Sequence, residues 1–144
     1  MLFPQRKSPR LKDYDYTGDG AYFVTICTYR RKLFFGDVIG GHMEHNSLGN
    51  LARMRLLELS ARWDGVLVDS HVVMPNHLHA IIMLTSSEKN MLEPQAGIHS
   101  SRVTLGRVIG LYKAGVTREA REKRWLPSDG LLWQGRYYNR IGRN

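Results

Sequence analysis

The sequence predicts an α+β protein with a ferredoxin-like fold, in which an antiparallel sheet carries helices on one face. The first observation is the order of the patterned segments, which reads strand, helix, two strands, helix and a possible last strand. The second is that only Pro75 and Asn76 separate the two middle strands, which must therefore be antiparallel neighbours. In such a fold the sheet face away from the helices can remain open.

The first strand is expected at residues 21–29, because AYFVTICTY is dense in β-branched and aromatic side chains. Residues 1–20 are basic and then polar, with prolines and glycines as breakers, so we expect an N-terminal arm there. A chain of 144 residues holds one core of ordinary size, and residues 21–144 are therefore expected to form a single domain. Residues 34–41 contain three glycines and are expected to be a loose connector.

The first helix is expected to be capped by Ser47 and to run to about residue 63. A strand at residues 66–74, the Pro75-Asn76 turn and a strand at residues 77–84 follow it. The helix has apolar residues at the three-and-four spacing of one buried face. These residues are Leu48, Leu51, Ala52, Leu56, Leu59 and Trp63.

A second helix is expected at residues 103–122, after an exposed loop at residues 85–101 that is rich in Ser, Glu, Asn, Pro and Gly. Its apolar side contains Leu105, Ile109, Tyr112 and Val116. Residues 127–130 are expected to turn, and the aromatic and basic residues 131–141 are expected to form the possible last strand.

The charge of the chain favours an anionic partner. Lys and Arg total 21 and Asp and Glu total 13, for a net charge of +8, so nucleic acid or an anionic membrane surface becomes the leading class of partner. The single cysteine, Cys27, excludes an internal disulfide and fits a reducing compartment. Because no apolar run approaches the roughly 20 residues of a membrane span, we expect no membrane insertion and a cytoplasmic protein.

A His-x-His pair begins the third predicted strand. Side chains alternate along a strand, so His77 and His79 are expected on one face and Leu78 on the other. Their backbones would lie roughly 7 Å apart, twice the strand rise, which permits both imidazoles to bind one metal ion. The alternative is that they are ordinary histidines on a half-exposed strand.

The run VVMPNHLHAIIML resembles the signature of HUH endonucleases, in which two histidines flank one hydrophobic residue. It is similar in particular to the REP-associated tyrosine transposases. Three further blocks agree with that family in the same order, so that the resemblance covers residues 10–143. They are RLKDYDYTGDGAYFVTICTYRRKLFFGDV, the helix end ARWDGVLVDS and LLWQGRYYNRI.

The resemblance implies cleavage and rejoining of single-stranded DNA on a ferredoxin-like sheet. It implies that His77 and His79 bind a divalent cation, Mg²⁺ or Mn²⁺, at the scissile phosphate, and that a tyrosine attacks to give a 5′-phosphotyrosine. The family tyrosine lies on a further helix after the block WQGRYYNRI, at a position beyond Asn144, so no catalytic residue is assigned. Tyr112 is expected in the core, and Tyr137 and Tyr138 in packing or stacking.

Several cationic clusters predict binding to single-stranded or hairpin DNA, some of them beside aromatic residues that can stack on unpaired bases. A solvated charged surface is the alternative explanation for any one cluster, and Trp133 equally suits a core position. The residues expected to contact DNA are Arg30, Arg31, Arg107, Arg118, Arg121, Trp133, Gln134 and Arg136.

Two functions follow from these residues. The first is a metal-dependent DNA-binding protein of the transposase type, acting on hairpin DNA, with the histidine pair present. The second is a non-catalytic transposase remnant that binds DNA hairpins without cleaving them. A structural zinc domain is a poor third reading, because Cys27 and the histidines outside the pair lack the close spacing of a tetrahedral site.

Overall fold

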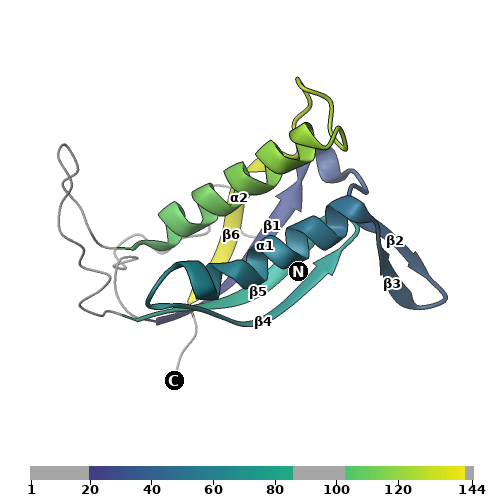
Figure 1. Ribbon diagram of the computed structural model, residues 1–144. Coiled ribbons are helices and arrows are strands. Elements are labelled where there is room, and N and C mark those ends of the chain that lie inside the picture. The colour runs from purple at the N-terminus through teal and green to yellow at the C-terminus, as the bar shows by residue number, and fades with distance from the viewer. Residues whose placement is uncertain (1–19, 86–102, 142–144) are drawn as a thin grey trace.

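The computed structural model describes residues 20–85 and 103–141, which form one sheet layer and one helix layer (Figure 1). Within these ranges a four-stranded sheet has the order β4-β5-β1-β6, and every neighbouring pair is antiparallel. The helices lie together on one face of this sheet. This order and helix placement confirm the predicted ferredoxin-like fold. The elements are β1 (Gly20–Thr28), α1 (Ser47–Arg62), β4 (Val66–Met74), β5 (His77–Leu84), α2 (Leu105–Glu122) and β6 (Trp133–Ile141).

The hydrophobic core lies between the sheet and the helices. Alternate residues of β1 and β5 point into it, and Tyr22, Ile26 and Ile82 are fully buried. Among the helix residues, Tyr112 of α2 is buried as expected, and its hydroxyl donates a hydrogen bond to the Ala52 carbonyl of α1 at 2.8 Å. The core thus holds one face of each element and leaves the second face of the sheet outside it.

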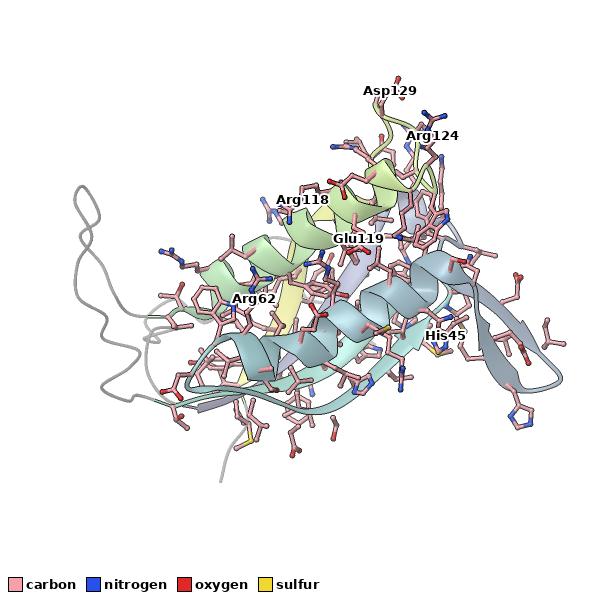
Figure 2. The ribbon with its side chains drawn as sticks, in the orientation of Figure 1. His45, Arg62, Arg118, Glu119, Arg124 and Asp129 are labelled. Carbon is pink, nitrogen blue, oxygen red and sulfur yellow. The ribbon has the colours of Figure 1, made fainter. Side chains whose placement is uncertain are left out.

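A charged contact also joins the helices. The Arg55 guanidinium of α1 donates from Nη2 to Glu119 Oε1 of α2 at 2.6 Å and from Nε to the same oxygen at 3.2 Å. Figure 2 shows Glu119 on the side of α2 that faces α1, whereas Arg118 projects away from α1. The two sides of α2 therefore differ, one contacting α1 and the other available to ligands.

The start of α1 differs by one residue from the prediction. Asn46, and not Ser47, is the N-cap, because its side chain accepts a hydrogen bond from the Gly49 amide at 2.8 Å. The cap also donates from Nδ2 to the Phe34 carbonyl at 2.9 Å. Gly49 approaches this segment so closely that a Cβ there would lie 2.1 Å from the Phe35 oxygen. Asparagine and glycine thus fix how α1 enters the fold.

The predicted loose connector at residues 34–41 is wrong, because most of it belongs to a hairpin. β2 (Gly36–Ile39) and β3 (His42–His45) pair in antiparallel register and project from the body of the domain (Figure 1). Gly40 and Gly41 have φ angles of 59° and 81° and form the two-residue loop that this type of hairpin requires. The glycines that suggest looseness in the sequence therefore make a tight turn.

Two predicted segments lie largely outside the described residues, namely the arm at residues 1–20 and the loop at residues 85–101. The other predicted strands are confirmed, including β6 as the last strand and the turn between β4 and β5. Neither α1 nor α2 has an apolar stretch long enough to cross a membrane.

Candidate metal and nucleic-acid site

The histidine pair lies on the open face of the sheet. Leu78 has no exposed surface and points into the core, whereas His77 is half-buried and His79 is exposed on the opposite side. The two imidazole rings meet edge to face, with their centroids 4.8 Å apart and an interplanar angle of 73°. The predicted placement of both rings on one face is therefore confirmed.

Each ring has a hydrogen-bond partner for Nδ1. His77 Nδ1 lies 2.8 Å from Asn76 Oδ1, and because an amide oxygen only accepts, this nitrogen carries the proton and Nε2 holds the lone pair. His79 Nδ1 lies 2.9 Å from the hydroxyl oxygen of Thr25 on β1. Outer contacts of this kind orient histidine ligands toward a metal ion. The arrangement makes Nε2 the atom through which either ring would bind a cation.

The electrostatics of the pair favour neutral His77. Burial lowers the pKa of His77 below its ordinary value of 6.5, and the neighbouring His79 and Arg31 lower it further. A histidine must be neutral to bind a metal through its lone pair. At pH 7 the side chain is therefore in the form that a metal site requires.

The turn before the pair is held by bonds to other elements. The Pro75 carbonyl accepts from the Phe35 amide at 3.0 Å. The Asn76 carbonyl accepts both from the Thr28 amide at 3.0 Å and from the Thr28 hydroxyl at 3.0 Å. These contacts fix the backbone from which Asn76 and His77 project, so the first imidazole has a defined position before any ligand arrives.

Two consecutive arginines follow β1 at this end of the sheet. Arg30 and Arg31 have φ angles of 54° and 57°, in the left-handed region that non-glycine residues rarely occupy. This backbone directs Arg31 toward Cys27, whose sulfur lies 3.4 Å from Arg31 Nη1 and which pairs directly with His77 across the strands. The guanidinium of Arg30 lies over the Tyr29 ring, 5.3 Å from its centroid. A cation thus stands beside the histidine pair, suitable for a phosphate.

Further residues of the open face were not found from the sequence. Tyr138 of β6 pairs with Thr25, which pairs in turn with His79, so these three form one row across the sheet. Tyr138 is 38% exposed, and on the same face Phe23 is 46% exposed opposite Arg140. Only the strand register reveals this arrangement. It gives the open face aromatic and cationic side chains beside the histidines.

The residues predicted to contact DNA fall into separate groups. Arg30 and Arg31 lie at the histidine end of the sheet, and Arg118 and Arg121 share a cleft with Trp133. Arg107 is exposed near the start of α2, about 16 Å along the helix axis from Arg118, and does not line that cleft. Half-buried Gln134 accepts a bond at its carbonyl from Lys113, and Arg136 is exposed on β6.

The donor set was tested for its fit to a metal ion. Within residues 20–85 and 103–141, no group of three or more His, Cys, Asp or Glu side chains lies close enough to hold one. His77 and His79 would therefore supply two nitrogen donors, with water and phosphate oxygens at the other positions. Such a mixed set fits Mn²⁺ better than Mg²⁺, which prefers oxygen ligands throughout.

Comparison with solved structures shows the class of fold. The structure of a REP-associated tyrosine transposase bound to a REP hairpin matches with a TM-score of 0.58 and 17% identity, over 94% of this chain and 63% of that one. A putative transposase from Deinococcus radiodurans matches with a TM-score of 0.56 and 14% identity, over 93% of this chain and 85% of that one. The chain therefore has a transposase fold, and it spans less than two thirds of the REP-associated protein.

Sequence comparison identifies the family more narrowly. The chain is 33% identical over 146 residues to an uncharacterized protein from Haemophilus influenzae, and the match covers 96% of this chain and 79% of that protein. The chain belongs to the same family as this protein. No family model matches the chain.

Proposed function

We propose that this protein binds single-stranded or hairpin DNA on the open face of its sheet, with a divalent cation held by His77 and His79 against a phosphodiester. The observation that carries the proposal is the histidine pair itself, whose Nδ1 atoms are engaged by Asn76 and Thr25 beside the Arg31 cation. A transposase fold and a net charge of +8 support it.

The chain's own residues suit a flexible strand. Phe23 and Tyr138 are exposed on the open face and offer rings on which unpaired bases can stack. Arg140 pairs with Phe23 on that face, and Arg31 lies at the histidine end, so cations flank the rings where the phosphates of a strand would pass. A bound divalent cation would supply positive charge to the non-bridging oxygens of the phosphodiester.

Cleavage through a tyrosine ester requires a hydroxyl that reaches this phosphodiester. Tyr112 is unsuitable, because its hydroxyl is buried and bonded to the Ala52 carbonyl, and burial raises its pKa well above the ordinary value. Tyr137 is also buried, whereas Tyr138 shares the open face with His79. Because no described group activates Tyr138, we expect DNA binding without efficient cleavage by this chain.

A second candidate function is a DNA-binding protein that takes up hairpins without a metal and without cleaving them. The observation that favours it is that the described residues offer two imidazoles and no third ligand in the same cluster. Binding would then depend on phosphate neutralisation by the arginines, with a steep dependence on salt. The two candidates differ in whether the histidines and the cation affect binding.

The experiment measures the affinity of a labelled DNA hairpin with a single-stranded flank by fluorescence anisotropy, in Mn²⁺ and in EDTA. We expect Mn²⁺ to strengthen binding by the wild type and not by the His77→Ala, His79→Ala double variant. His42→Ala is the matched control, because His42 is exposed on the projecting β2-β3 hairpin.

Equal affinity of the double variant and the wild type in Mn²⁺ would exclude the metal-dependent function and leave the second candidate. A flat salt response would exclude both. The same samples, run on a denaturing gel, would reveal a covalent adduct. If one forms, the expectation of inefficient cleavage is wrong, and its loss in Tyr138→Phe would identify the nucleophile.

A further inference from the structure

A second candidate site lies on the helix side of the sheet, at the edge formed by β6. Here α2 and Trp133 enclose a cleft of about 520 Å³, a size typical of pockets for small ligands. The α2 residues that line it repeat at helical spacing along the side turned away from α1, where Figure 2 shows Arg118. They are Lys113, Ala114, Thr117, Arg118, Arg121 and Glu122.

The aromatic wall of the cleft is held rigidly. The Trp133 indole donates from Nε1 to the Lys113 carbonyl at 3.1 Å. The rings of Phe35 and Tyr112 pack against it, with centroids 5.6 Å and 5.8 Å from that of Trp133. The ring remains half-buried and lines the cleft, so it presents a fixed aromatic surface. Fixed rings of this kind stack on nucleobases with little loss of conformational entropy.

The charged wall consists of three cations and one carboxylate. Lys113 donates from Nζ to the Gln134 carbonyl at 2.9 Å, and Arg121 donates from Nη2 to the Gly130 carbonyl at 2.8 Å, so both are positioned by the chain. Arg118 is exposed, and Glu122 contributes the carboxylate. The positive excess favours a phosphate, and the guanidinium groups suit its oxygens.

We propose that this cleft binds a nucleoside phosphate, with the base against Trp133 and the phosphate at Arg118 and Arg121. The inference rests on the proposed function insofar as that nucleotide belongs to a DNA strand. The topology supports a strand as its source. Trp133 pairs with Thr28, the residue after Cys27, which pairs with His77. Cleft and histidine pair therefore lie about two strand spacings apart, roughly 10 Å, at one end of the sheet and on opposite faces.

The test measures binding of a short oligothymidine to the full chain over a range of salt concentrations. Arg118→Gln with Arg121→Gln should weaken binding about tenfold and reduce the slope of log K against log salt by about 0.7 for each phosphate that is no longer neutralised. Arg53→Gln with Arg62→Gln is the matched control, because it removes the same charge from exposed positions on α1. Arg118→Gln alone, which leaves the Arg121 bond to Gly130 intact, should lower the slope by about half as much.

Stacking is read from the tryptophan emission. Oligothymidine should quench the wild type, and Trp133→Phe should lose that quenching although Trp63 and Trp125 remain. Titrations with thymidine monophosphate and with inorganic phosphate separate the sources. Quenching at equal affinity by the free nucleotide identifies a nucleotide pocket, and much tighter binding of the oligonucleotide identifies a strand site.

The inference is overturned if the Arg118 and Arg121 variants bind like the α1 control, if Trp133 emission does not respond, or if inorganic phosphate binds as well as both nucleotide ligands. Its failure is distinguishable from that of the proposed function. The His77→Ala, His79→Ala variant should keep the Trp133 response to oligothymidine in EDTA, whatever becomes of its response to Mn²⁺.

Discussion

The two faces of the sheet are built from the same strands but are used differently. On the helix face, Leu78 and its alternate neighbours are buried under α1 and α2. On the other face, His77 and His79 stand among partly exposed side chains and bond to Asn76 and Thr25. Consecutive residues of β5 therefore belong either to the core or to the candidate site. The alternation lets one short strand stabilise the fold and present two imidazoles.

The largest expected effect tests this division within three consecutive residues. Leu78→Ala should lower the free energy of unfolding by about 2–5 kcal/mol, because it removes a fully buried side chain. His79→Ala should change it by no more than about 0.5 kcal/mol, because that residue is exposed. Urea denaturation measures both. Comparable losses in the two variants would mean that the open face is also needed for stability.

A smaller effect is expected for two tyrosines on opposite faces. Tyr112→Phe removes the buried 2.8 Å hydrogen bond to the Ala52 carbonyl and should cost about 0.5–1.5 kcal/mol. Tyr138→Phe is the control on the open face and should stay within about 0.5 kcal/mol of the wild type. Thermal unfolding of the pair measures the difference. If Tyr138→Phe lost as much as Tyr112→Phe, the open-face hydroxyl would have a structural role.

The smallest effect concerns protonation of His77. Its pKa is lowered in the folded protein by burial and by His79 and Arg31, so the unfolded chain takes up this proton at a higher pH. The resulting stability is present above about pH 6.5 and is lost as the pH falls through that unfolded value. An NMR titration should give His77 a midpoint below 6.5, and His77→Gln should reduce the acid loss of stability. A midpoint at or above 6.5 would contradict the electrostatics of the pair.

The sequence predicted much of the fold, because the decisive signals were local. Only Pro75 and Asn76 stand between the strands that became β4 and β5, and the apolar spacing of α1 and α2 marked their buried sides. The β2-β3 hairpin was missed because its strands have four residues each and little buried apolar surface. With so little periodicity, the Gly40-Gly41 turn resembles a loose connector in the sequence.

The candidate site could be predicted only as far as strand alternation reaches. Placing His77 and His79 on one face needed no more than the two-residue period of a strand. The contact of His79 with Thr25 joins residues 54 positions apart and depends on how β1 and β5 are paired. The role of Lys113 in the cleft likewise depends on its bond to the Gln134 carbonyl. Such contacts follow from register and packing, which a local pattern does not contain.

The central claim is that the two imidazoles act together on one divalent cation. Its most direct test is the NMR spectrum of the histidine rings during addition of Mn²⁺ to the wild type and to Thr25→Val, which removes the hydroxyl beside His79 Nδ1. We expect substoichiometric Mn²⁺ to broaden the signals of His77 and His79 together, before those of His42 and His71, and to do so at higher concentration in Thr25→Val. Uniform broadening of all the histidines, or broadening of one ring of the pair without the other, would contradict it.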